Sequence, residues 1–143
     1  MVEVVYEDTE ILDLHPEFFV SWLSDVVQKE GQLLGDICMI FCSDEYLLEV
    51  NRKHLDHDYY TDIITFDYTE DGVVSGDLFI SVDRVLDNAN ALGEMFHVEL
   101  HRVIVHGVLH LLGYKDKSES ESLLMREKES WALSLIVPRE TLG

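Results

Sequence analysis

Short apolar runs, spaced along the chain, predict the strands of a small sheet. They are rich in β-branched and aromatic residues, have polar borders, and cover residues 2–6, 37–42, 63–66 and 78–82. Between the last two runs, Glu70-Asp71-Gly72 and Ser75-Gly76 carry residues typical of turns. We therefore expect these two strands to pair as a hairpin.

Apolar residues repeating every three to four positions predict helices over about residues 16–31, 43–55, 83–91, 94–112 and 118–138. Pro16, Ser43 and Ser118 are residues that begin helices, the last as part of the capping box Ser118-Glu119-Ser120-Glu121, and we expect Pro138 to end the last helix. The element order predicts an α+β fold: one domain over residues 1–143, with a small mixed sheet of about four strands packed against about five helices.

The composition agrees with a globular domain. The 143 residues are 47% hydrophobic, which is enough for one core. We find no uncharged apolar run long enough for a membrane span, and the acidic start of the chain does not resemble a signal peptide. We therefore expect a cytoplasmic protein with no membrane partner. Cys38 and Cys42 fall on one predicted strand, too far apart to bond, and we expect buried thiols.

The formal net charge of −19 bears on possible partners. Residues 1–50 hold twelve acidic and one basic residue, residues 51–100 hold eleven and three, and residues 101–143 hold six of each. Phosphate backbones attract basic residues, so we do not expect DNA as a partner. The acidic part is either a solvated surface that keeps the protein in solution or a surface that steers it toward a basic partner such as a ribosomal protein.

One segment points to metal chemistry. His106 and His110 lie four residues apart in an apolar run, which places both imidazoles on one face of a helix that Gly113 ends. Asp116 follows after a short turn that can bring an oxygen ligand back to the pair. Two histidines and one carboxylate are a known zinc ligand set, which leaves a fourth position for water. Glu99, on the same helix stripe, either hydrogen-bonds a ligand imidazole or is a surface carboxylate.

The residue after the first histidine argues against a metallopeptidase. In zinc-peptidase helices a glutamate at that position is the general base, whereas here it is Gly107. A hydrolase built on this site needs its base elsewhere, and Asp62 is the candidate.

Three stretches resemble the YbeY family of bacterial rRNA-maturation endoribonucleases. His106-Gly-x-Leu-His110-Leu-x-Gly113-Tyr114 is similar to that family's signature, and Thr61–Phe66 and Gly76–Ser81 resemble its other motifs. Asn51 stands where the family has an asparagine. Order and spacing agree from Asn51 to Trp131.

The resemblance implies a small sheet with surrounding helices and one Zn²⁺ per chain, held by His106, His110 and the residue at position 116. It implies cleavage of single-stranded RNA in 16S rRNA 3′-end maturation and in ribosome quality control. The implied partners are single-stranded rRNA and the small ribosomal subunit or its proteins.

Two positions depart from the family. Lys115 and Asp116 stand where the family usually ends its signature with Asp-His, so the third ligand becomes a carboxylate, which also makes Mn²⁺ competitive with zinc. Leu55 stands where an arginine is usual, and an apolar side chain cannot bind phosphate.

We therefore predict Asp62, Arg102 and Lys115 as the catalytic residues, the last two as phosphate contacts together with Lys117. Tyr59, Tyr60 and Tyr114 either stack on unpaired bases or pack against the protein. The missing arginine and the acidic charge also leave a second hypothesis, a non-catalytic small-subunit assembly factor with a structural metal.

Overall fold

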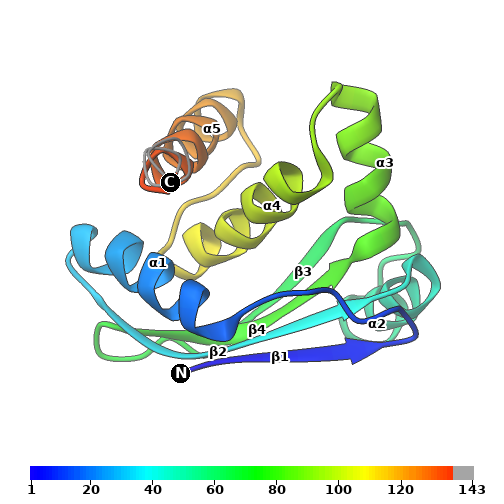
Figure 1. Ribbon diagram of the computed structural model, residues 1–143, viewed down its shortest axis with the longest axis horizontal. Helices are drawn as coiled ribbons and strands as arrows, with labels where there is room; N and C mark the ends of the chain where they lie inside the picture. Colours follow the sequence, from blue (N-terminus) through cyan, green and yellow to red (C-terminus); the bar gives the residue numbers. More distant parts are fainter. Residues whose placement is uncertain (137–143) are drawn as a thin grey trace.

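Four strands form one mixed sheet in the order β1-β2-β4-β3 (Figure 1). The computed structural model describes residues 1–136, so the stop predicted at Pro138 lies outside the described residues. The strands are β1 (Val2–Glu7), β2 (Leu33–Cys42), β3 (Ile63–Asp67) and β4 (Val73–Ser81). β1 and β4 run parallel to β2, whereas β3 pairs antiparallel with β4. The predicted hairpin is therefore confirmed.

Five helices accompany the sheet: α1 (Pro16–Lys29), α2 (Asp44–Leu55), α3 (Val82–Leu92), α4 (Phe96–Leu111) and α5 (Glu119–Ser134). The predicted start signals act as expected. Pro16 begins α1, the Ser43 side chain accepts a hydrogen bond from the Tyr46 amide, and Ser118 forms a complete capping box with Glu121. The α+β fold class is confirmed.

The two faces of the sheet carry different cores. Alternate residues of β2 such as Met39 and Phe41 pack with α1, α4 and α5 in the main core, while Cys42 joins Leu47 and Ile64 in a smaller cluster beneath α2. α4 lies between the sheet and α5, and α5 forms the layer farthest from the sheet (Figure 1). This sandwiched position explains why α4 is apolar on most of its surface.

The turn predicted at Ser75-Gly76 is wrong, because both residues lie inside β4. The chain reverses earlier, at Asp71 and Gly72, both of which have positive φ. A Cβ on Gly76 would lie 2.5 Å from the Phe66 carbonyl oxygen and 2.9 Å from Leu111 Cδ2. Glycine is needed there so that β3 and α4 can approach β4 closely, and not to turn the chain.

The start of the second strand differs from the predicted one. β2 begins at Leu33 instead of residue 37, and an irregularity in its pairing with β4 falls between Leu34 and Ile37. Both cysteines are free thiols, but only Cys42 is buried as expected, whereas Cys38 is half-buried. Within residues 1–136, no helix is long and apolar enough to span a bilayer.

Candidate metal centre

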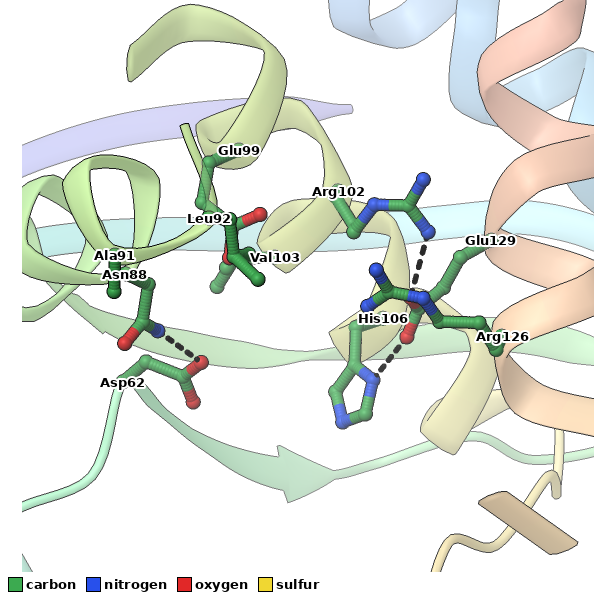
Figure 2. Close-up of a pocket in the computed structure, with 10 residues that line it drawn as sticks. All are labelled: Asp62, Asn88, Ala91, Leu92, Glu99, Arg102, Val103, His106, Arg126 and Glu129. Carbon is green, nitrogen blue, oxygen red and sulfur yellow. Dashed lines mark hydrogen bonds and ion pairs between the residues drawn. The ribbon is translucent and has the colours of Figure 1, made fainter. Parts of the chain in front are cut away.

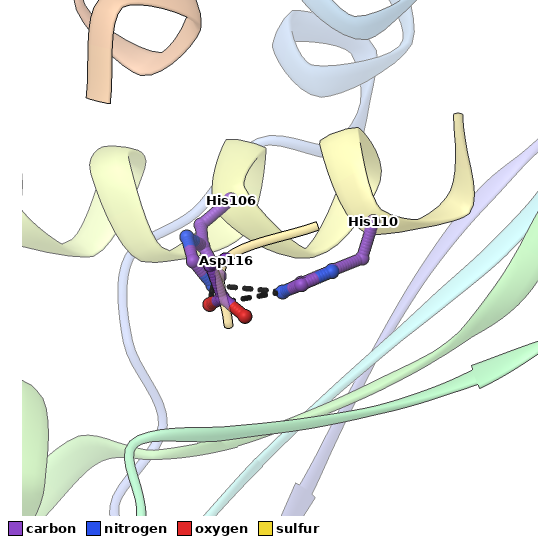
Figure 3. A group of neighbouring side chains, drawn as sticks. All are labelled: His106, His110 and Asp116. Atoms are coloured by element: carbon purple, nitrogen blue, oxygen red, sulfur yellow. Dashed lines mark hydrogen bonds and ion pairs between the residues drawn. The ribbon is translucent and has the colours of Figure 1, made fainter. Parts of the chain in front are cut away.

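Helix α4 presents two imidazoles to the same point. The His106 and His110 rings lie one turn apart, with centroids 4.6 Å apart, and their Nε2 atoms are 3.0 Å apart. α4 ends at Leu111, and Gly113, at φ 108°, reverses the chain. The turn then carries Asp116 back under the helix (Figure 3).

The carboxylate completes a triangle of ligand atoms. Asp116 Oδ2 lies 3.2 Å from His106 Nε2 and 3.3 Å from His110 Nε2. Ligand atoms around a tetrahedral zinc are about 3.3 Å from one another, given bonds of about 2 Å. Within residues 1–136, this is the one cluster of three such side chains with ligand atoms close enough to share an ion. The structure therefore brings His106, His110 and Asp116 together as a group that could hold a metal ion.

The hydrogen bonds of the two rings test whether a cation fits. His110 Nδ1 lies 3.0 Å from the Tyr114 carbonyl oxygen, which can only accept, so that nitrogen carries the proton. His106 Nδ1 lies 2.6 Å from Glu129 Oε2 and donates in the same way. In the neutral rings, both Nε2 atoms then point lone pairs at each other and at a carboxylate oxygen. Such an arrangement is repulsive unless a cation lies between the three atoms, so the donor set fits a divalent metal.

Glu129, on α5, orients the first ligand. It is 5% exposed and also accepts a hydrogen bond of 3.0 Å from Arg102 Nη1. Burial alone would raise the pKa of Glu129, but the hydrogen bonds and positive charges of His106 and Arg102 hold it below its usual value. Burial has the opposite effect on His106 and lowers its pKa, but the hydrogen bond and charge of Glu129, with the charges of Asp116 and Asp62, raise that pKa above its usual value. The Glu129 carboxylate is therefore ionised, as an acceptor for a ligand imidazole must be.

Glu99 matches neither alternative left open from the sequence, because it is not on the surface and the carboxylate on His106 is Glu129. Glu99 is buried in a neighbouring cavity, and burial raises its pKa. The partner of His106 comes instead from a helix 23 residues farther along the chain. One signal for it was present in the sequence: Glu129 shares a helical stripe with the apolar residues Met125, Ala132 and Leu133, all buried in the structure. A carboxylate on an apolar stripe indicates a buried partner.

The cavity has a volume of about 370 Å³ and lies between α3, α4 and α5 beside His106 (Figure 2). It brings together Asp62 and Arg102, two of the three residues predicted to be catalytic. Asp62 Oδ2 accepts a hydrogen bond of 3.2 Å from Asn88, and burial raises the pKa of Asp62. Lys115 is exposed on the turn after α4 and is not among the residues that line the cavity. Arg126, which the sequence analysis did not single out, does line it.

Gly107 faces away from the ligands and against the sheet. A Cβ at this position would lie 2.7 Å from Ile63 Cδ1 and 3.0 Å from Leu78 Cδ2. A glutamate side chain at this helix position would therefore point into the core and not toward the metal ligands. The absence of the peptidase base is a consequence of how closely α4 packs on β3 and β4.

Arg52, in the last turn of α2, is not free to replace the arginine that is absent at position 55. Leu55 is 40% exposed at the end of α2. Arg52 donates to Asp58 at 2.6 Å and to Glu49 at 2.7 Å, so its charge is already paired. Buried Asn51 donates from Nδ2 to the Tyr59 carbonyl at 2.9 Å and anchors the loop before β3.

A second group of contacts anchors the turn that carries Asp116. The Tyr114 hydroxyl donates to Glu30 Oε1 at the end of α1, and Lys128 Nζ on α5 donates to Glu30 Oε2 at 2.9 Å. The Lys128 ammonium also lies 5.5 Å from the centroid of the Tyr114 ring. Because the Tyr114 carbonyl accepts from His110, these contacts tie the second ligand and the turn to α1 and α5.

Comparison with known proteins gives one consistent family. Residues 5–136 match the family described as Endoribonuclease YbeY. A protein of that name from Parabacteroides distasonis is 50% identical over 134 residues, 94% of each chain. Another, from Cytophaga hutchinsonii, is 55% identical over 116 residues, 80% of this chain and 81% of its own.

A solved structure shares the fold. The solution structure of a Thermotoga maritima protein superposes with a TM-score of 0.70 at 25% identity, covering 99% of this chain and 92% of that one. The two curated relatives cover most of this chain at about half identity, and the histidine pair of the family's signature lies in the ligand triangle described above. The chain belongs to the YbeY endoribonuclease family.

Proposed function

We propose that this protein is a zinc-dependent endoribonuclease that cleaves unpaired strands of ribosomal RNA in the cytoplasm. Its place in the cell would be the maturation of the 16S rRNA 3′ end and the quality control of ribosomes. The observation that carries the proposal is the triangle of His106, His110 and Asp116 atoms, with edges of 3.0, 3.2 and 3.3 Å, in a chain of this family. Those three side chains would hold the ion.

The residues around the metal centre have separate roles in this proposed reaction. A divalent cation supplies a Lewis acid beside the phosphodiester. Asp62, in the cavity next to His106, accepts the proton of the attacking water, and its raised pKa makes it a stronger base than an exposed aspartate. Arg102 is held by Glu129 and directs its remaining N–H groups to a phosphate oxygen. Lys115, exposed beside Asp116, contacts a flanking phosphate.

A preference for unpaired RNA agrees with the exposed aromatic residues of the loop before β3. Tyr59 is 56% exposed and stacks on His57 with ring centroids 5.2 Å apart, which offers a platform for an unpaired base. The rings of Tyr60 and Tyr114 are less available, because Arg84 and Lys128 lie over them at 5.4 and 5.5 Å from the ring centroids, and their hydroxyls bond Glu45 and Glu30. The acidic surface would favour basic proteins of the small subunit as partners.

Cleavage of a rRNA fragment tests the proposal. Zinc-reconstituted protein should cut a single-stranded fragment, leave a duplex and the matching single-stranded DNA intact, and stop when a chelator is added. His110→Ala should abolish cleavage and lower the zinc content to background, with the fold checked by circular dichroism. Absence of cleavage by protein that carries one zinc per chain would overturn the proposal.

The alternative function is that of a non-catalytic assembly factor whose metal is structural. The observation that favours it is Leu55, an exposed apolar residue where the family usually has arginine, together with the net charge of −19. A factor of this kind would bind small-subunit proteins without cutting RNA, and chelation would unfold it. The same assay, run with a pull-down on purified small subunits, separates the two functions.

A further inference from the structure

The cavity beside the metal centre has one cation without an ion-pair partner. Of the four arginines among residues 1–136, three form ion pairs: Arg52 with Glu49 and Asp58, Arg84 with Asp44 and Asp87, and Arg102 with Glu129. Arg126 lines the cavity and forms no ion pair within the described part of the chain. Because the chain has 29 acidic and only ten basic residues, an arginine without an ion pair in this cavity is a candidate for binding an anionic ligand.

The other charged residues that line the cavity determine how an anionic ligand would be received there. Glu129 is already neutralised by Arg102 and His106. Asp62 and Glu99 remain. Burial raises the pKa of both, and for Glu99 the nearby charges of Arg102 and Arg126 act against that rise. A polyanion that enters this cavity beside His106 meets these carboxylates, and Arg126 is the cavity-lining arginine without an ion pair that can offset them.

The position of Arg126 directs it to the same place as the ligands. Arg126 precedes Glu129 by three residues on α5, so the two side chains share a helix face. Glu129 reaches His106 from that face, and the Arg126 guanidinium extends toward the cavity from the next position along it (Figure 2). The Arg126 side chain is exposed, so an RNA strand in solvent can reach it. A guanidinium presents paired N–H donors that match the oxygens of a phosphodiester.

We propose that Arg126 binds a phosphate of the RNA strand, next to the phosphodiester that lies at the metal centre. This inference rests on the proposed function and adds a substrate-binding residue to it. Arg126 contacts a phosphate that does not react, so it contributes to binding of the strand and leaves the chemical step unchanged.

Binding and cleavage should be measured on zinc-loaded protein for wild type, Arg126→Ala and Arg126→Lys. The matched control is Lys29→Ala, which removes one exposed positive charge from α1. Fluorescence anisotropy with a 2′-O-methyl oligoribonucleotide, which resists cleavage, gives the affinity at several salt concentrations. Cleavage of the unmodified strand gives kcat and KM, while elemental analysis and thermal unfolding report zinc content and stability.

Arg126→Ala should weaken binding about tenfold or more and raise KM equally, with kcat unchanged. The slope of log affinity against log salt should fall by about 0.7, the value for one phosphate contact on a single strand. Arg126→Lys should recover part of the affinity, and Lys29→Ala should behave as wild type. Zinc content should be the same in all four proteins.

The outcomes separate this inference from the proposed function. If wild type cleaves and Arg126→Ala binds and cleaves as well as wild type, the inference is wrong and the proposed function stands. If wild type binds the oligonucleotide without cleaving and Arg126→Ala weakens that binding, the inference stands and the enzymatic function fails. Loss of zinc in both Arg126 variants overturns the inference, because Arg126 would then support the metal site and not the strand.

Discussion

At the scale of single residues, the centre depends on acceptors that determine which ring nitrogen of each histidine carries the proton. Glu129 does so for His106 with a carboxylate, and Tyr114 does so for His110 with a backbone carbonyl. Only the first of these can be removed by substitution. Glu129 is therefore the residue at which the contribution of the surroundings to metal affinity can be measured.

Glu129→Gln should lower zinc affinity by about tenfold or more with the fold preserved, because the amide no longer holds a negative charge against the His106 N–H. Competition with a chromophoric chelator measures the dissociation constant. Glu127→Gln, an exposed position on the same helix, is the matched control and should bind zinc as wild type does. Equal affinities in the two variants would contradict the role assigned to Glu129.

The third ligand can be exchanged for the one usual in the family. Asp116→Ala should weaken zinc binding, because it removes one of three ligand atoms, while Asp116→His should retain one zinc per chain. Asp116→His should also shift the preference from Mn²⁺ toward Zn²⁺, since an imidazole is a softer ligand than a carboxylate. Metal content by elemental analysis after growth with both ions gives the result, and unchanged zinc affinity in Asp116→Ala would exclude Asp116 as a ligand.

At the scale of elements, α1 and α5 hold the turn that follows α4. Glu30 at the end of α1 accepts hydrogen bonds from Tyr114 in the turn and from Lys128 on α5. Burial alone would raise the pKa of Glu30, but these hydrogen bonds and the Lys128 charge hold it below its ordinary value of 4.5. The two contacts thus join three separate elements around the Asp116 turn.

This pKa makes the stability depend on pH in one direction. Because the pKa of Glu30 is lower in the folded state, the unfolded chain binds more protons between that value and about 4.5, and the contribution of Glu30 is lost as the pH falls through this window. Glu30→Gln should therefore lower the free energy of unfolding by about 1 kcal/mol at pH 7 and by progressively less below about pH 4.5. Urea unfolding at pH 7 and at a pH below about 4.5 tests this prediction. Glu10→Gln, which changes an exposed glutamate, is the control and should not show this pH dependence.

The contact of α4 with the sheet supports a second test at this scale. Gly107→Ala places a methyl group 2.7 Å from Ile63 Cδ1, and overpacking of about 1–3 kcal/mol should exceed the gain of about 1 kcal/mol in helix propensity. Ile63→Val removes that Cδ1 atom and should cost about 0.5–1.5 kcal/mol alone. The double variant should be more stable than the sum of the two changes predicts. If the change in the free energy of unfolding of the double variant equals the sum of the two single changes, the two positions do not touch.

At the scale of the whole molecule, most of the surface repels nucleic acid, and attraction is limited to a few cations near the metal centre. Arg126 lines the cavity, and Lys115 and Lys117 are exposed on the turn beside Asp116. The first hundred residues carry 23 acidic against four basic residues. A strand bound as proposed would therefore contact the protein at these cations.

The salt dependence of RNA binding should be shallow. With four phosphate contacts, from Arg102, Lys115, Lys117 and Arg126, the slope of log affinity against log salt should be no steeper than about −3 for a single strand. Titrations of a 2′-O-methyl oligonucleotide between low and moderate salt provide the value. A slope of about −4 or steeper would mean that the strand follows a longer basic track than these residues form.

The sequence by itself determined the features that arise within a few residues of one another. The caps at Ser43 and Ser118, the hairpin of β3 and β4, and the histidine pair followed by Gly113 and Asp116 all depend on local backbone geometry. Only the tertiary structure decided which distant groups meet. It placed Glu129 and not Glu99 against His106, and it brought Asp62 and Arg126 to one cavity.

Glycines show the same division most clearly. Gly113 adopts a positive φ, and its position just after a helix indicates this in the sequence. Gly76 and Gly107 instead allow neighbouring elements to pack closely. A missing side chain leaves no local signal of what lies opposite it. For that reason Gly76 was mistaken for a turn residue, and the reason for the missing peptidase glutamate at Gly107 became visible only with the sheet packed against α4.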